Sequence, residues 1–429
     1  MKKKNKKNIF YIIFVILLIC IFILGLLPLS ISGSGSKKLD KSHELTQTGL
    51  TYEEENNFQE AISYYSLALK EKPTFFEAYY LRARAYFQIY KYNSAISDLN
   101  IYINENPKDM EAVSLRGLCE YENGQYDSAL HDFTSVINSN QASFEIYYQR
   151  GIVESKIGNY ENAIKDLSVF LENDPDNKDA LLLLSQLYGL TGNWKTSLDM
   201  CEQFLKLEPN STDGLSLCGS SLYNMGKYDE SKSYWDKVIE LIQNNSNAFF
   251  NRGNASFKLA IFEDAILDYS KSIALDPPNL EALKNRGLAY QRVGELEKSI
   301  IDLENALSIK PEDVSILISL TLTYIEMQDF EAALILLDRA KAIDPYNGEI
   351  YFHRGNVYFS IKDYLSAVEE YSLAIEYKGN LENTYYNRGL TYLKLGEKDL
   401  AKSDFLNLLE ITSDESVIET IDQILSEIS

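Results

Sequence analysis

The sequence predicts an all-α solenoid built from eleven consecutive copies of a two-helix unit. Similar segments recur at multiples of 34 residues, as in FFNRGNASFKLA from Phe249 and YYNRGLTYLKLG from Tyr385. Within each copy, apolar and small residues recur at the spacing of α-helical faces, and Gly and Pro recur where helices would have to end. A chain of 429 residues made of stacked repeats needs no single central core.

Eleven blocks of 34 residues follow one another from residue 42 to residue 415 without insertion or deletion. Apolar or aromatic residues occupy position 4 of every block and position 11 of eight blocks, and small residues occupy positions 8 and 20. In the block from residue 280, Leu283, Gly287 and Tyr290 would lie on one face of the first helix. The small residues are expected to let the two helices of a block approach closely. The blocks begin at residues 42, 76, 110, 144, 178, 212, 246, 280, 314, 348 and 382.

Gly and Pro recur at two fixed positions and predict the turns. Position 15, where the first helix must end in a left-handed residue, holds Gly124, Gly158, Gly192, Gly226, Gly294 and Gly396. Position 32, where the second helix must stop, holds Pro73, Pro107, Pro175, Pro209, Pro277, Pro311 and Pro345. We expect each block to be a helical hairpin, and no strands.

An additional helix is expected after the last block, over residues 416–429. Its apolar residues, which include Val417, Ile421 and Ile424, form one stripe, and its polar residues face away. Ser413 is the expected N-cap. This helix would cap the array and cover its last apolar surface.

At these positions the sequence resembles the tetratricopeptide-repeat family, which has a large residue, Gly or Ala, Tyr, Ala, an aromatic, Ala and Pro at the same spacing. The resemblance covers residues 42–415. It departs from the family pattern at Thr321, where a small residue is usual, and at Lys398, where an aromatic is usual. The resemblance implies a right-handed superhelix of helix-turn-helix repeats, with the first helices lining a concave surface that binds other proteins or peptides.

Positions 7 and 23 vary together. Seven blocks have Arg at position 7 and an acid at position 23, and the other four blocks have neither. Pairing within a block leaves no charge unmatched, so we predict an ion pair between the two helices of a block, which could not lose one member without stranding the other. The predicted pairs are Arg82 with Asp98, Arg116 with Asp132, Arg150 with Asp166, Arg252 with Asp268, Arg286 with Asp302, Arg354 with Glu370 and Arg388 with Asp404.

The charge balance argues against nucleic acid as a partner. The formal charge is −22, and residues 42–429 alone hold 33 bases and 62 acids, a balance of −29. Such a surface repels phosphate backbones. Cysteine and histidine show no metal-ligand spacing, so no metal or other cofactor is implied. Core packing is the expected role of the cysteines, and a disulfide between Cys201 and Cys218 stays open.

The amino-terminal segment predicts a membrane tether. Residues 1–7 form a basic flank, residues 8–29 form a transmembrane anchor, and residues 30–41 form a flexible linker. The lysines of the flank predict a cytoplasmic amino terminus and a repeat region on the far, periplasmic or extracytoplasmic, side of the membrane. The alternative is a cleaved signal and an exported protein.

The resemblance places positions 2, 5, 9, 12 and 13 on the concave surface, and aromatic and amide side chains are frequent there. Exposed aromatics suit the capture of an extended peptide or a helix. The alternative for these rings is packing between adjacent first helices. The expected groove residues are Tyr80, Phe87, Tyr121, Tyr148, Tyr223, Phe250, Asn254, Phe257, Phe352, Asn356, Phe359 and Tyr386.

These residues favour a membrane-tethered scaffold or adaptor that binds polypeptide segments, and not an enzyme. The three histidines lie in different blocks without a catalytic constellation, and phosphate loops are missing. The cationic clamp with which some family members grip a peptide carboxylate is also missing, because Phe250, Leu322 and Glu326 replace its cations. The alternatives are a structural, self-associating envelope component and a non-catalytic regulatory subunit of a membrane enzyme complex.

Overall fold

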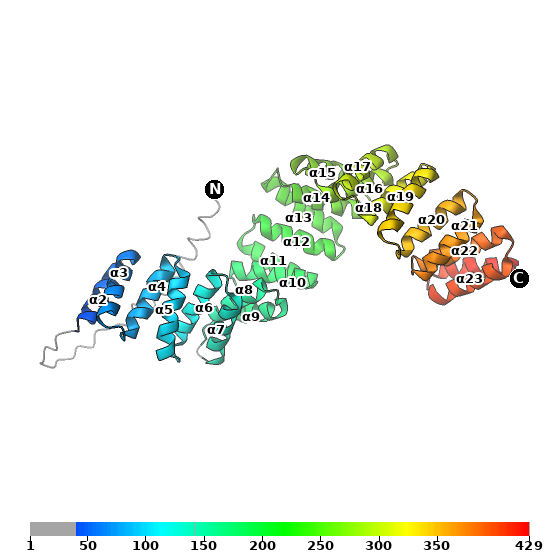
Figure 1. Cartoon of the computed structure of the whole chain (residues 1–429). Coiled ribbons are helices and arrows are strands. Elements are labelled where there is room, and N and C mark those ends of the chain that lie inside the picture. Colours follow the sequence, from blue (N-terminus) through cyan, green and yellow to red (C-terminus); the bar gives the residue numbers. More distant parts are fainter. Residues whose placement is uncertain (1–39, 141, 429) are drawn as a thin grey trace. The chain divides into compact units, whose positions relative to one another are not determined.

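The computed structural model describes residues 40–140 and 142–428, which form 23 α-helices and no strand (Figure 1). The predicted basic flank, the predicted anchor and most of the predicted linker lie outside the described residues. No helix within these ranges combines the length and the apolarity that crossing a bilayer requires. Within these ranges the chain divides into two compact units, the first ending at residue 132 and the second beginning at residue 133, which we describe separately.

The first helix of each repeat recurs every 34 residues, with shifts of one residue at the two ends of the array. We number the repeats 1 to 11 in chain order. The first helices are α2 (Lys41–Glu54), α4 (Phe76–Gln88), α6 (Met110–Glu122), α8 (Phe144–Lys156), α10 (Lys178–Leu190), α12 (Thr212–Asn224), α14 (Ser246–Lys258), α16 (Leu280–Arg292), α18 (Val314–Glu326), α20 (Gly348–Ser360) and α22 (Leu381–Leu395).

Every second helix begins at position 17 of its block. These helices are α3 (Phe58–Glu71), α5 (Tyr92–Glu105), α7 (Tyr126–Asn138), α9 (Tyr160–Asn173), α11 (Trp194–Leu207), α13 (Tyr228–Leu241), α15 (Phe262–Leu275), α17 (Leu296–Ile309), α19 (Phe330–Ile343), α21 (Tyr364–Glu376) and α23 (Lys398–Ile411). The expected helical hairpins are therefore present throughout the described repeats.

The turn inside each hairpin has the same backbone conformation in all eleven repeats. The six glycines at position 15 have φ between 77° and 86°. Five repeats place another residue there, and these residues also have positive φ, between 59° and 67°. They are Asn56, Tyr90, Ala260, Gln328 and Lys362. The turn geometry is thus set by the packing of the two helices and not by glycine alone.

Small residues at position 8 allow the two helices of a repeat to approach closely. A Cβ atom added to Gly355 would lie 2.5 Å from the ring of Tyr371, and one added to Gly389 would lie 2.7 Å from the ring of Phe405. Real Cβ contacts of that length do not occur, so the large ring at position 24 requires glycine opposite it. The same complementarity recurs at Gly49 with Tyr65, Gly219 with Trp235 and Gly253 with Tyr269.

In the second unit, the first helices lie closer to one another than the second helices do. Successive first helices contact each other at α10 and α12, α12 and α14, α14 and α16, α16 and α18, and α20 and α22. Among the described residues, no two successive second helices make a contact of that extent. The first helices of this unit therefore lie on the inner side of its curvature, and the second helices lie on the outer side.

The helix after the last repeat, α24 (Glu415–Ile428), packs its apolar stripe on the final hairpin. Ile421 is buried together with Phe405 and Leu408 of α23. The expected N-cap was wrong by one residue: Asp414, and not Ser413, accepts the hydrogen bond from the backbone N–H of Ser416. A carboxylate at this place also interacts favourably with the helix dipole.

The structure resolves the question of the two cysteines. Cys201 on α11 and Cys218 on α12 form a disulfide, with their Cα atoms 5.8 Å apart. Core packing alone was therefore an incomplete expectation, because the two side chains join repeat 5 covalently to repeat 6. Cys119 is a free, buried cysteine.

Candidate functional site: the face of the first helices

The seven predicted ion pairs are confirmed. In each repeat the arginine on the first helix lies 2.6–3.0 Å from the acid on the second helix, and every one of these acids is buried. Six pairs are bidentate, with Nε and Nη2 donating to the two carboxylate oxygens, as in Arg286 and Asp302. In the seventh, Arg354 Nε lies 3.0 Å from Glu370 Oε1 without hydrogen-bond geometry.

The third nitrogen of each guanidinium reaches the preceding repeat, which the sequence reasoning missed. Nη1 donates to an oxygen at position 25 of that repeat, so each arginine joins three helices. The acceptors are Ser66 for Arg82, Asn100 for Arg116, Thr134 for Arg150, Asp236 for Arg252, Ser270 for Arg286, Asp338 for Arg354 and Ser372 for Arg388. These arginines are fully engaged in holding the repeats together and are not available as an anion site.

The ten aromatic residues of the expected groove all contact a ring on the second helix of their own repeat. Those at position 12 contact the aromatic at position 17, with centroids 5.3–5.8 Å apart: Phe87 with Tyr92, Tyr121 with Tyr126, Tyr223 with Tyr228, Phe257 with Phe262 and Phe359 with Tyr364. Those at position 5 contact position 24 or 27, at 4.8–6.4 Å: Tyr80 with Tyr102, Tyr148 with Phe170, Phe250 with Tyr269, Phe352 with Tyr371 and Tyr386 with Phe405.

These contacts change the role of the aromatic set. The rings brace the hairpin of their own repeat, and some also pack toward the next first helix, as the alternative expected: Tyr148 lies against the cluster that contains Leu184 and Leu187 of α10, and Phe87 lies against the one that contains Ala112 and Cys119 of α6. Nine of the ten are half-buried and present only part of a ring to solvent. Phe352 is 8% exposed, so its expected place on an open surface was wrong: the ring is buried against Tyr371 and His353.

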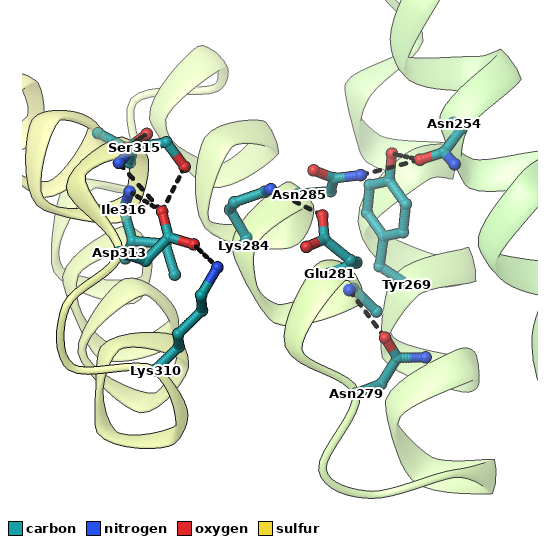
Figure 2. Close-up of polar contacts among 12 residues, drawn as sticks. Asn254, Tyr269, Asn279, Glu281, Lys284, Asn285, Lys310, Asp313, Ser315 and Ile316 are labelled. Carbon is teal, nitrogen blue, oxygen red and sulfur yellow. Dashed lines mark hydrogen bonds and ion pairs between the residues drawn. The ribbon is translucent and has the colours of Figure 1, made fainter.

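Asn254 forms a fixed polar group on α14 that points to a binding role. Its Oδ1 accepts a hydrogen bond from the Tyr269 hydroxyl at 2.8 Å and another from Asn285 Nδ2 at 3.0 Å. Figure 2 shows this oxygen directed at Tyr269 and Asn285, with the Asn254 nitrogen on the side away from them. Burial raises the pKa of the Tyr269 hydroxyl, which therefore remains a donor.

The same arrangement recurs three repeats later. Asn356 Oδ1 on α20 accepts from the Tyr371 hydroxyl at 2.8 Å and from Asn387 Nδ2 at 2.9 Å. Asn at position 9, Tyr at position 24 and Asn at position 6 of the next block coincide only in these two places. The joint occurrence of the three residues is the sequence signal that would have revealed the pairing.

The two asparagine pairs leave matching groups open. Asn254 Oδ1 already accepts from two donors, and turning this amide over would set its Nδ2 against Asn285 Nδ2, donor against donor. Asn254 Nδ2 and Asn285 Oδ1 have no hydrogen-bond partner among the described residues, and the same is true of Asn356 Nδ2 and Asn387 Oδ1. Each pair thus offers one oriented donor and one oriented acceptor on the inner side of the second unit.

The charged residues beside this group are paired with each other. Lys284 Nζ lies 2.7 Å from Glu281, and Lys310 Nζ lies 2.8 Å from Asp313, which also caps α18 (Figure 2). A cation at position 5, such as Lys284, is therefore already neutralised by its own helix. The asparagine pairs, by contrast, keep an open donor and an open acceptor.

No group of three or more His, Cys, Asp or Glu side chains in residues 40–140 and 142–428 is arranged to hold a metal ion. His353 is largely buried beside Phe352, and burial lowers its pKa. This face is suited to binding, because its polar groups are amides that are fixed in position.

Four family models match parts of the chain. Models described as tetratricopeptide repeat match residues 46–100, 80–140, 280–313 and 382–415, and a model described as TPR repeat matches residues 355–396. A model described as anaphase-promoting complex, cyclosome, subunit 3 matches residues 156–238. No curated protein matches the sequence.

Several solved structures are similar in fold. The carboxyl-terminal part of a TPR repeat-containing protein from Cytophaga hutchinsonii is 19% identical, with a TM-score of 0.47, and the match covers 56% of this chain and 98% of that one. Yeast Tom70 is 14% identical, with a TM-score of 0.44, over 90% and 95% of the two chains. YrrB, described as a TPR protein with an unusual peptide-binding site, is 23% identical, with a TM-score of 0.38, over 43% and 95%.

The solved structures carry no part of the assignment, because their identities and TM-scores are low. The family models carry the assignment, since they match segments near both ends of the repeat region and their period agrees with the helix pairs. This chain is a tetratricopeptide-repeat protein.

Proposed function

We propose that this protein is a scaffold or adaptor that binds an extended segment of another polypeptide along the face of its first helices. The observation that carries the proposal is the two asparagine pairs. A peptide unit offers one N–H donor and one C=O acceptor. One open amide nitrogen and one open amide oxygen, both fixed, complement such a unit without selecting its side chain.

The half-buried aromatics add contact area beside the asparagines. Phe250 and Phe257 lie one turn before and one turn after Asn254 on α14, and Phe359 follows Asn356 on α20. Their rings are already held by the second helices, so little side-chain entropy is lost when a partner covers them. Tetratricopeptide repeats commonly serve as non-catalytic interaction scaffolds, and one matching model is named after a subunit of a protein complex. Both points support a binding role that needs no cofactor.

We include the membrane tether in this proposal. The lysines of residues 1–7 and the apolar run of residues 8–29 support an anchor with a cytoplasmic amino terminus. The disulfide between Cys201 and Cys218 fits a repeat region in an oxidising compartment, where such bonds persist. Protease added outside sealed, right-side-out membrane vesicles should digest residues 42–429, and full protection of that region would contradict this orientation.

A photocrosslinking experiment on the intact anchored protein tests the binding role. A photoreactive residue at Lys258, one turn after Asn254 on the same helix and exposed, should crosslink to a second polypeptide. The same residue at Leu365, which is exposed on the second helix α21, should not give that product. No product at Lys258, or the same product at both sites, would contradict binding on the first-helix face.

A further inference from the structure

Three exposed aliphatic side chains occupy position 22 of three successive second helices in the second unit. Leu267 on α15 is 69% exposed, Ile301 on α17 is 57% exposed and Ile335 on α19 is 63% exposed. We call these three residues the aliphatic row. They lie on the outer helices, away from the asparagine pairs.

The repeat fold does not require an apolar residue at this position. Position 22 is polar in all eight other repeats, where it holds Ser63, Ser97, His131, Lys165, Asp199, Ser233, Glu369 and Ser403. The row therefore begins and ends abruptly, with Ser233 before it and Glu369 after it. Exposure of three aliphatic side chains to water is unfavourable, and another surface that covers them removes this cost.

Oppositely charged edges flank the aliphatic row. Position 18, one turn before the row on the same helical face, holds Glu263, Glu297 and Glu331, all exposed. Position 26, one turn after the row, holds Lys271, Asn305 and Arg339, also exposed. The three glutamates have no ion-pair partner among the described residues, and Arg339 uses one nitrogen to donate to the Pro311 carbonyl.

We propose that the aliphatic row is the contact surface for a second copy of this chain. A two-fold axis that runs along the row places each of the three residues against the same residue of the second copy. It also makes the paired second helices antiparallel. The acidic edge of one copy then meets the basic edge of the other. Glu263 faces Lys271 of the second copy, Glu331 faces Arg339, and Glu297 faces Asn305.

The charge pattern selects this arrangement over its rivals. A two-fold axis along the helices would instead bring acid against acid and base against base, which is repulsive. A lipid surface would have to desolvate both charged edges without supplying opposite charges in that order. A second copy supplies the matching edges, and the interface does not use the asparagine pairs, so it is independent of the proposed polypeptide binding.

The oligomeric state of the full chain in detergent micelles tests the proposal. The wild type should form a dimer whose dissociation constant rises at least tenfold in the variant L267S/I301S/I335S. Leu190→Ser, at a leucine that is 66% exposed on the first helix α10, is the matched control and should dimerise as the wild type does. A monomeric wild type at about 100 μM, or an equally tight dimer of the triple variant, would overturn the proposal.

Charge reversal tests the antiparallel register. E263K/E331K makes both edges basic and K271E/R339E makes both edges acidic, so each variant alone should be monomeric and an equimolar mixture should form a heterodimer. A mixture that stays monomeric would contradict the register. Binding of zwitterionic lipid vesicles that disappears in the triple serine variant would assign the row to lipid and overturn the second-copy proposal. N254D/N356D should leave the dimer intact, which separates this test from that of polypeptide binding.

Discussion

The guanidinium of Arg286 holds the carboxylate of Asp302 with two hydrogen bonds of 2.7 Å, although the two residues lie on different helices of their repeat. A third bond, from Nη1 to Ser270, extends the contact into the preceding repeat. Asp302 is buried, so the cost of removing its carboxylate from water is offset by this arginine. A similar unit recurs in six other repeats and ties each of those hairpins both internally and to the preceding repeat.

Removing one member of this pair is expected to cost more stability than replacing both. Arg286→Leu should lower the free energy of unfolding by about 3–5 kcal/mol, because it strands a buried carboxylate. The double variant R286L/D302L should recover much of that loss, since repeat 9 uses Leu320 and Leu336 at these positions. Denaturant unfolding measures both, and a double variant that is as unstable as the single one would contradict the account.

The turn at position 15 can be improved at Ala260, which has a φ of 59°. Ala260→Gly removes the steric cost of a left-handed Cβ and should stabilise the chain by about 0.5–1 kcal/mol. Ala274→Gly, on the exposed face of α15, is the control and should destabilise by about the same amount. Thermal unfolding of the two variants should show shifts of opposite sign, and shifts of equal sign would argue against strain in the turn.

The disulfide should make stability depend on the redox state. It closes a short loop between Cys201 and Cys218, with a sequence separation of 17, and such a crosslink contributes about 3 kcal/mol. Reductant should therefore lower the melting temperature of the wild type but not that of C201S/C218S. If reductant lowers both equally, the effect does not come from this bond.

Glu120 is expected to weaken the fold as the pH rises. Burial raises the pKa of Glu120 to about 7, and repulsion by Asp132 acts in the same direction, while Arg116 lowers it. Below about pH 4.3 this carboxyl is neutral in both the folded and the unfolded protein. Between about pH 4.3 and pH 7 it ionises more readily in the unfolded protein, so the free energy of unfolding falls as the pH rises. Glu120→Gln should therefore raise the melting temperature at pH 8 and change it little at pH 4.5. Glu111→Gln, exposed on the same helix, is the control.

Periodicity made most of the fold predictable. A fixed residue type at a fixed position was visible from the sequence, and this included the arginine at position 7, its acid at position 23 and the glycine at position 15. The acceptors at position 25 were not visible, because Ser, Asn, Thr and Asp occur there and share only an oxygen that accepts a hydrogen bond. A repeat pattern is easy to see when one residue type recurs at a position, and hard to see when different residue types share only the ability to accept a hydrogen bond.

The candidate site was predicted less well for a related reason. A residue such as Phe352 was assigned to the inner face from its position in the repeat, but burial depends on the size of its neighbours across the hairpin, here Tyr371. The two asparagines were named among the expected groove residues from their position alone. Their hydrogen bonds to Tyr269 and Tyr371, which fix the direction of the open donor, come from contacts between positions 15 residues apart. The cysteine pair was equally hidden, since adjacency alone does not establish a bond.

The affinity of the double variant N254D/N356D for a crosslinked partner polypeptide tests the central claim most directly. Aspartate keeps the oxygen that accepts from the tyrosine and from the second asparagine, but it removes the open donor, so the fold should persist. The control N245D/N279D adds the same charge at two helix N-caps, where aspartate serves as well as asparagine. We predict at least a tenfold loss of affinity in N254D/N356D and an unchanged affinity in the control. Equal affinity of the two variants, with unchanged melting temperatures, would contradict the claim that these asparagines bind the polypeptide.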